Sequence, residues 1–182
     1  MKLIDIRDFE KVYKNQKISH KNITINNRVT LIKGKNGKGK STLLRGLLGL
    51  IHYKGSIIHE LDFAYMPEEM RIPYHLKVNT YLELMLPRNS YLEKDRLLKL
   101  FNMTKHKDKE IHDLSKGMYL KTRLIYTLSL EKDMYILDEP FNGLDKISTE
   151  ILKTYILDSK KSFLISSHLP IFNSDSIEVI EL

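Results

Sequence analysis

The sequence contains no cysteine and no tryptophan, and only 5 prolines and 8 glycines among its 182 residues. The absence of cysteine excludes a disulfide framework and is compatible with a reducing compartment. No apolar run approaches the roughly 20 residues that a membrane-spanning helix needs. The first residues, MKLIDIRDFEKVY, lack the uninterrupted apolar core of a secretory signal peptide. These absences predict a cytoplasmic protein.

The chain is long enough for one domain with a sizeable core, or for a core with a small subdomain. It carries a formal net charge of +7. Such a charge is compatible with a surface for nucleic acid, acidic lipid or phosphate ligands, but a solvated lysine-rich surface is the preferred explanation. The charge alone therefore does not choose a partner.

Short apolar runs recur along the chain and alternate with segments of helical periodicity. The predicted strands are Lys2–Ile6, Ile18–Ile25, Val29–Ile32, Gly55–His59, Phe63–Met66, Met134–Leu137, Phe163–Ser166 and Ile177–Ile180. Helices are predicted after Gly39, around 78–86, after a Ser90–Glu93 capping box, after Ser115 and around 147–156. This order predicts one α/β domain over 1–182, with a helical insert at about 72–130.

A glycine-rich loop follows the predicted strand 29–32. Gly34, Gly39, Lys40 and Ser41 match the pattern G-x-x-x-x-G-K-[ST], between a strand and an apolar helix. Glycines let several backbone N–H groups turn towards phosphate oxygens, and the helix N-terminus adds partial positive charge. Lysine can then reach the β- and γ-phosphates, and the serine hydroxyl can bind Mg²⁺. The loop is therefore predicted to hold a nucleotide phosphate chain.

Two acidic residues follow the apolar strand MYIL. Alone, Asp138 and Glu139 are typical of a strand that runs into an acidic turn. Beside a phosphate loop, a parallel strand would bring Asp138 to the Mg²⁺ side of the site. Glu139 could then act as the general base that activates water. Pro140 is expected to end the strand.

Four apolar strands end in polar residues, at Gly34, Glu68, Asp138 and His168. Ligands bind beyond the carboxyl ends of the strands in open parallel sheets. Right-handed crossovers make a parallel arrangement the expected one. Taken singly, Glu68 could equally be a surface carboxylate, and His168 is more typical of a solvated loop histidine. Together, the four ends predict a single site at one edge of the sheet.

The order of these motifs resembles that of the ATP-binding cassette (ABC) ATPases over nearly the whole chain. GKNGKGKST, residues 34–42, is similar to the Walker A motif of that family, and MYILDE is similar to its Walker B motif. FNGLD resembles the D-loop, which implies that Asp145 approaches a partner subunit. FLISSH resembles the switch segment, which implies that His168 contacts the γ-phosphate. The resemblance implies catalytic roles for Lys40, Glu139 and His168, Mg²⁺ ligation by Ser41, Glu68 and Asp138, and nucleotide contacts from Gly34, Asn36, Gly37, Lys38, Gly39, Lys40, Ser41 and Thr42.

Tyr13 stands roughly 20 residues before the phosphate loop, where the family places an aromatic ring that stacks on adenine. Every base has a π face, so an aromatic ring suits this role. An ordinary core or surface tyrosine is the alternative.

LSKGM, residues 114–118, lies where the family carries its LSGGQ signature. Ser115 and Gly117 match the signature, whereas Lys116 and Met118 depart from it. Glu68 stands where many members have the glutamine of the Q-loop, and a carboxylate donates a hydrogen bond only when it is protonated. Both departures resemble the exporter branch that moves drugs, peptides or haem-related cargo.

The resemblance implies a P-loop NTPase fold with an antiparallel β subdomain and a helical subdomain inserted in a mainly parallel core sheet. It implies ATP and Mg²⁺ as ligands, and a homodimer or heterodimer with another ABC subunit in which Ser115 and Gly117 face the partner's ATP. It further implies a separate integral membrane subunit, with this chain on the inner face of the cell membrane. The leading hypothesis is thus the ATP-hydrolysing subunit of an exporter.

Two other functions stay open at this point. A soluble ABC ATPase that acts on nucleic acid or ribosomes would suit the positive charge, but the chain shows neither a long coiled-coil insertion nor a second cassette. A catalytically silent regulatory cassette is disfavoured because Lys40, Asp138, Glu139 and His168 are all present. No nucleic acid partner is therefore expected.

Overall fold

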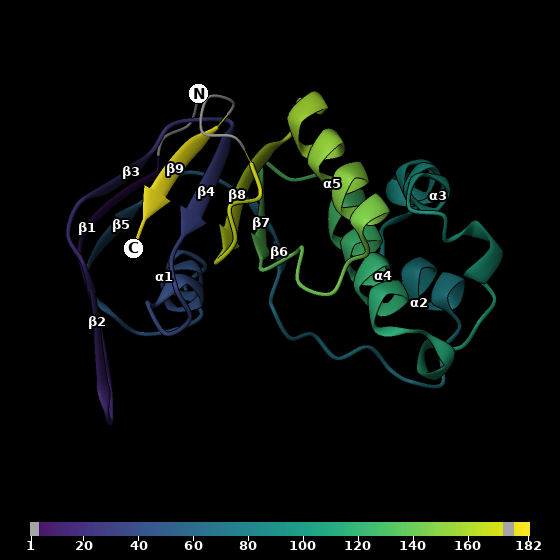
Figure 1. Cartoon of the computed structure of the whole chain (residues 1–182), viewed down its shortest axis with the longest axis horizontal. Helices are drawn as coiled ribbons and strands as arrows, with labels where there is room; N and C mark the ends of the chain where they lie inside the picture. The colour runs from purple at the N-terminus through teal and green to yellow at the C-terminus, as the bar shows by residue number, and fades with distance from the viewer. Residues whose placement is uncertain (1–3, 173–176) are drawn as a thin grey trace.

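The computed structural model describes residues 4–172 and 177–182 (Figure 1). The strands are β1 (Ile4–Tyr13), β2 (Gln16–His20), β3 (Ile23–Ile25), β4 (Val29–Lys33), β5 (Lys54–Ile58), β6 (Phe63–Met66), β7 (Met134–Asp138), β8 (Ser162–Ser167) and β9 (Glu178–Glu181). The α-helices are α1 (Lys40–Leu47), α2 (Val78–Met85), α3 (Tyr91–Leu100), α4 (Lys116–Ser129) and α5 (Lys146–Asp158). Short 3₁₀ turns lie at Arg88–Ser90, Thr104–His106 and Ile111–Asp113.

Strand β1 organises an antiparallel sheet, in which β2, β3 and β5 all pair with it. The predicted single strand Ile18–Ile25 is wrong, because the chain leaves β2 at His20 and resumes as β3 at Ile23. The predicted strand Lys2–Ile6 begins outside the described residues, and its described part continues to Tyr13. The sheet bulges near Asp8, whose φ is 48°, and the bulge breaks the alternation of apolar and polar residues along the strand. The sequence pattern therefore did not predict the polar extension of β1 to Tyr13.

The second sheet has the strand order β6-β7-β8-β4-β9, and all of its described pairings are parallel. The predicted parallel alignment of the four strands is therefore confirmed. Their carboxyl ends lie at one edge, where Asp138 is the last residue of β7 and Gly34, Glu68 and His168 follow the other three strands. The continuous apolar character of these strands reflects burial on both faces.

The two faces of the parallel sheet belong to different hydrophobic clusters. On one face, Ile32, Ile136 and Leu164 pack with α1 and the antiparallel sheet. On the other face, Leu31, Tyr135, Leu137, Phe163 and Ile165 share a cluster with α2, α3, α4 and α5. Figure 1 shows the result, with the parallel sheet between the α1 side and the longer helices. Successive side chains of a strand point to opposite faces, so β7 and β8 serve both clusters.

Helices α2, α3 and α4 lie between β6 and β7 in the chain, as the helical insert predicted. Ser115 caps α4, since its Oγ accepts a hydrogen bond from the Met118 N–H at 3.3 Å. The predicted Ser90–Glu93 capping box is wrong. Ser90 ends a 3₁₀ turn and makes no side-chain cap bond, while Glu93 pairs with Arg96, Tyr155 and Lys161 instead.

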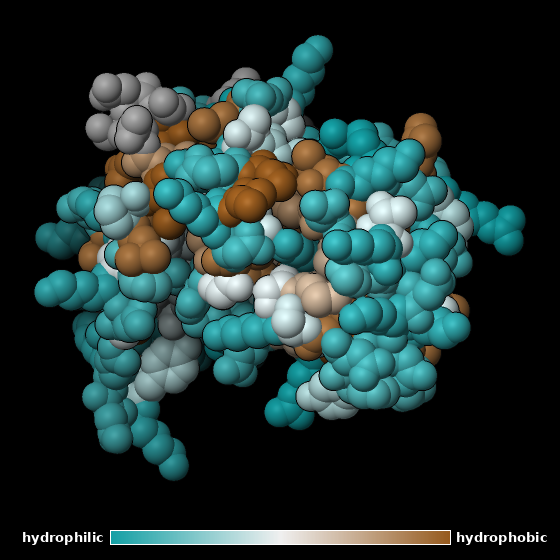
Figure 2. Space-filling model, turned by 45° about the vertical axis from the view of Figure 1, so that its right-hand side comes forward, coloured by the Kyte–Doolittle hydropathy of each residue, from teal (hydrophilic) through white to brown (hydrophobic). Residues whose placement is uncertain are grey.

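Within the described ranges, no helix is both long and apolar enough to cross a lipid bilayer. The face shown in Figure 2 is mostly hydrophilic, with scattered small groups of apolar side chains.

Candidate nucleotide site

The loop 34–39 connects β4 to α1 and is built around positive backbone angles. Gly37 and Gly39 have φ values of 82° and 90°, a region that disfavours residues with a Cβ atom. A Cβ on Gly39 would also lie 2.3 Å from the Ile18 side chain. Gly39 caps α1 without any side-chain bond, so the first N–H groups of the helix are available to an anion.

Lys40 begins α1 and is buried beneath this loop. Its ammonium donates to the Gly34 carbonyl at 2.8 Å and lies 3.1 Å from Glu139 Oε1. The contact with Glu139 is an ion pair without hydrogen-bond geometry, because Oε1 has no hydrogen-bond partner among the described residues. Lys40 therefore joins the phosphate loop to the acidic end of β7.

The acidic pair is held by a serine of the neighbouring strand. Ser166 in β8 donates to Asp138 Oδ1 and accepts from the Glu139 N–H at 3.0 Å. Glu139 has a φ of 49°, which is unfavourable for a residue other than glycine. Ser166 therefore joins the Asp138 carboxylate to the backbone of Glu139.

His168 follows β8 and reaches the same carboxylate. Its Nδ1 lies 3.0 Å from Glu139 Oε2, and its side chain is about one-third exposed at 34%. Glu139 thus has Lys40 at one oxygen and His168 at the other. The structure brings the three residues predicted as catalytic into one contact chain.

Two cavities meet at this edge of the sheet. The first, about 370 Å³, is lined by the predicted residues Asn36, Gly37, Gly39, Lys40, Ser41, Thr42, Glu68 and Glu139. The second, about 480 Å³, is lined by Asp138, Lys116, Arg123 and neighbouring residues, and again by Glu68 and Glu139. The two cavities therefore adjoin at these two carboxylates. The stem of Lys116 packs over Gly143, within 3.2 Å of the place where a Gly143 Cβ would be.

Two residues at this edge were missed by sequence reasoning. Gln16 lines the first cavity and donates to the Gly37 carbonyl at 2.7 Å, and Ser166 bridges the acidic pair. The contact of Gln16 with the phosphate loop could not be predicted, because a single glutamine after a turn belongs to no recognisable motif. The SSH sequence at the end of β8 offered a hint of the second, but only His168 was interpreted.

The remaining predicted residues lie around this core. The Tyr13 hydroxyl is 3.4 Å from Thr42 Oγ1, and the residue is 40% exposed. Lys38 is exposed and does not line the first cavity. The ring of Tyr13 is thus accessible beside the loop.

Ser115, Gly117 and Asp145 line neither of these cavities. Asp145 caps α5 by accepting from the Ser148 N–H at 2.8 Å and pairs with Lys121 at 3.3 Å. These contacts with Ser148 and Lys121 lower the pKa of Asp145 to about 2, so the carboxylate is charged at neutral pH.

The residues present fit a magnesium ion. Asp138 Oδ2 is buried without a hydrogen-bond partner in the described chain, and the Ser41 hydroxyl lines the adjoining cavity beside Glu68. Oxygen ligands of this kind are those that Mg²⁺ prefers. No group of three or more His, Asp or Glu side chains comes together as a metal site in the described ranges, so the phosphates and waters would have to supply further ligands.

Comparison with known proteins agrees with this geometry. The family model described as ABC transporter matches residues 19–142. The chain is 34% identical over 154 residues to the ABC transporter ATP-binding protein YhaQ of Bacillus subtilis, covering 74% of this chain and 52% of that protein. It is 31% identical over 189 residues to the zinc import ATP-binding protein ZnuC of Rickettsia bellii, covering 96% of this chain and 81% of that protein.

A solved structure of the ATP-binding subunit of an ABC transporter superposes with a TM-score of 0.82 at 23% identity, covering 99% of this chain and 85% of that one. That likeness supports the fold. The chain spans about half the length of YhaQ and of other relatives of similar identity. The matched family model and the extent of the match to ZnuC together show that the chain belongs to the ATP-binding subunits of the ABC transporters, a family of ATPases.

Proposed function

We propose that this chain binds ATP with Mg²⁺ and hydrolyses it to power an exporter whose membrane part is a separate subunit. One observation carries the hydrolytic part of the proposal. Lys40 and Glu139 line the cavity of the phosphate loop, and His168, which does not line it, continues the contact chain from Glu139. An ammonium, a carboxylate and an imidazole so arranged can bind a phosphate and activate a water beside it.

The residues have distinct roles in this proposal. The Lys40 ammonium exchanges its contact with Glu139 for a phosphate oxygen, and this exchange frees the carboxylate to accept a proton from water. His168 orients that carboxylate and contacts the γ-phosphate. Ser41, Asp138 and Glu68 would hold Mg²⁺, which supplies charge neutralisation at the phosphates. Gly34, Asn36, Gly37, Lys38, Gly39 and Thr42 surround the phosphate chain, and Tyr13 stacks on the base.

Ser115, Gly117 and Asp145 act on the nucleotide of a second ABC subunit, in a homodimer or a heterodimer. Support comes from their position, because none of them lines the cavity of its own phosphate loop. The α4 N-terminus is capped by Ser115 and carries Gly117 next to Gly143. Helix α4 is long enough for the partial positive charge at its N-terminus to attract an anion.

The proposed helical subdomain, 72–130, provides the face for the membrane subunit, and this places the chain at the inner face of the cell membrane. Lys116, Met118 and Glu68 support the exporter assignment, because these departures resemble the exporter branch. ZnuC is named for import, so the direction of transport needs its own measurement. No nucleic acid partner is proposed.

The first experiment tests hydrolysis through Glu139→Gln. Without a general base, we expect turnover to fall by about 10²–10⁴-fold, while ATP binding stays within a few-fold. Size-exclusion chromatography with ATP should then show a trapped dimer of the variant. Wild-type turnover in Glu139→Gln would contradict the proposed role of Glu139.

The second experiment tests the transport assignment. We expect co-purification from membranes to retain an integral membrane subunit, and inverted vesicles that contain both chains to accumulate cargo on addition of ATP. Salt-sensitive RNA binding, with no membrane subunit retained, would favour the ribosomal or nucleic acid alternative.

A further inference from the structure

The segment that follows β6 has an unusual means of support. Residues 67–72 contain no helix or strand, yet they carry Glu68 to the point where the two cavities meet. The backbone groups of such a segment need partners outside regular structure. Most of the partners that the structure shows come from two side chains of α4.

Tyr119 and Arg123 provide these partners from one face of α4. The Tyr119 hydroxyl donates to the Met70 carbonyl at 2.6 Å and accepts from the Ile72 N–H at 2.9 Å. Arg123 donates from Nη1 to the Glu68 carbonyl at 3.1 Å and from Nη2 to the Pro67 carbonyl. The two residues are four positions apart, a spacing that places them side by side on a helix.

Arg123 is costly to keep in this place. It is buried, burial lowers the pKa of its guanidinium, and its Nε has no hydrogen-bond partner in the described chain. The charge of Glu68 offsets part of this effect, but no described carboxylate forms an ion pair with Arg123. A buried cation without an ion pair carries a desolvation cost, and the two carbonyls that Arg123 binds are its compensating contacts.

The same helix begins at the cap residue Ser115. Tyr119 lies one turn beyond it and Arg123 two turns beyond it, within the single helix α4. Helix α4 thus connects its capped N-terminus to the side chains that bind the carbonyls of the loop 67–72.

We propose that Tyr119 and Arg123 are positioning residues that tie the loop 67–72 to α4, so that α4 sets the place of the Glu68 carboxylate in the ATP cavity. This inference rests on the proposed function, because it concerns the geometry of the hydrolytic site.

The decisive variant is Arg123→Lys, which keeps the charge but cannot donate to two carbonyls in a fixed fork. We expect kcat for ATP to fall about tenfold with KM changed less than about twofold, because small displacements at a reacting centre cost rate more than binding. Arg96→Lys is the matched control. Arg96 is half-exposed and pairs with Glu93 away from the cavity, so the kcat of the Arg96→Lys enzyme should equal that of the wild type.

A double-mutant cycle that combines Arg123→Lys with Glu68→Ala tests whether Arg123 acts through Glu68. In that background Arg123→Lys should have less than about a twofold further effect, because the group that it positions is gone. If the same tenfold loss appeared with Glu68 removed, Arg123 would act by another route and the inference would be wrong. Unchanged kcat in a folded Arg123→Lys protein would also overturn it.

Tyr119→Phe gives a second variant if Arg123→Lys does not fold. It removes both hydrogen bonds and keeps the ring, so we expect a decrease in kcat of about threefold and faster hydrogen exchange of the Ile72 amide. A Tyr119→Phe protein with normal exchange of the Ile72 amide and normal kcat would contradict the proposal that Tyr119 positions the loop 67–72. An inactive wild-type chain would defeat the proposed function, whereas an active enzyme indifferent to both variants would defeat this inference alone.

Discussion

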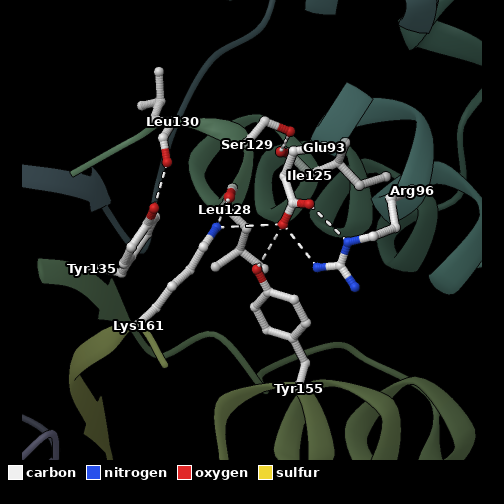
Figure 3. A network of polar contacts seen from close by, with 9 residues as sticks. All are labelled: Glu93, Arg96, Ile125, Leu128, Ser129, Leu130, Tyr135, Tyr155 and Lys161. Atoms are coloured by element: carbon white, nitrogen blue, oxygen red, sulfur yellow. Dashed lines mark hydrogen bonds and ion pairs between the residues drawn. The ribbon is translucent and has the colours of Figure 1, made fainter. Parts of the chain in front are cut away.

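Strands β7 and β8 carry a cluster of charged side chains at each end, and the two clusters differ in how completely their polar atoms are paired. At the carboxyl ends lie Lys40, Asp138, Glu139, Ser166 and His168. At the amino ends lies the network in Figure 3, centred on Glu93 and Lys161.

The network at the amino ends is saturated. Glu93 receives Arg96 at both oxygens, at 2.7 and 2.8 Å, as well as the Tyr155 hydroxyl and the Lys161 ammonium (Figure 3). Lys161 also donates to the Leu128 carbonyl at 2.6 Å and lies over the Tyr135 ring. These contacts with Arg96 and its neighbours lower the pKa of Glu93 to about 2.

The cluster at the carboxyl ends is unsaturated. Asp138 Oδ2 is buried without a hydrogen-bond partner in the described chain, and Glu139 Oε1 has an ion pair with Lys40 but no hydrogen bond. Glu139 also has a strained backbone conformation. Buried acceptors without hydrogen bonds and strained residues cost stability. The comparison indicates that the amino-end cluster joins α3 to α5 and β8, whereas the carboxyl-end cluster is arranged for a ligand that completes it.

Among the variants that test this comparison, the largest effect is expected on ATP affinity when the cation of the unsaturated cluster is removed. Lys40→Ala should weaken ATP binding by about 2–3 kcal/mol, or roughly 30- to 150-fold, because a phosphate would lose its charged partner. Fluorescence titration measures the affinity. Lys35→Ala, an exposed lysine of the same loop that does not line the cavity, should change it less than about threefold. Equal losses in the two variants would show that Lys40 contributes only general charge.

The next effect concerns the saturated network. Glu93→Gln should lower the free energy of unfolding by about 1–2 kcal/mol, because it removes the charge that Arg96 and Lys161 share in a partly buried place. ATP turnover should stay within about twofold. Urea unfolding measures the stability. Glu150→Gln, an exposed carboxylate paired with Lys153, is the matched control and should cost less than about 0.5 kcal/mol. A large loss of ATP turnover in folded Glu93→Gln would contradict the conclusion that the amino-end cluster stabilises the fold without acting in hydrolysis.

The smallest effect is the pH dependence of that stability difference. The folded-state pKa of Glu93 is about 2 against an ordinary 4.5, so its contribution is complete above the ordinary value and is lost as the pH falls towards about 2. The stability gap between wild type and Glu93→Gln should therefore be smaller at about pH 3.5 than at about pH 7. Unfolding curves at both pH values measure it, and a constant gap would mean that the charge of Glu93 is not what stabilises the network.

Much of the fold was predictable because its signals are local. The parallel strands are apolar on both faces, and each ends in a polar residue, so their positions and their common edge follow from the sequence. The antiparallel sheet was less predictable, because the polar residues and the bulge in β1 disrupt the alternation that marks a strand. The loop between β2 and β3 was hidden by the apolar residues on both of its sides.

The predicted capping box at Ser90 and Glu93 was wrong because a local pattern was used for a residue whose contacts are tertiary. A serine followed three positions later by a glutamate is a local signal for a capped helix start. The side chain instead joins Tyr155 and Lys161, which are 62 and 68 positions away. Local spacing describes what a residue can do within its own helix, and tertiary packing decides whether it does so.

The sequence by itself determined the phosphate loop, the acidic pair and the order of the motifs, because each of these depends on residues that are adjacent in the chain. Only the tertiary structure decided that Ser166 joins the acidic pair, that Lys40 and His168 share Glu139, and that Arg123 reaches the two loop carbonyls across 55 and 56 positions. Such contacts form when packed strands and helices bring distant side chains together, and no local periodicity encodes them. The LSKGM motif was visible as a helix cap, but its connection to Glu68 through α4 emerges only in the folded chain.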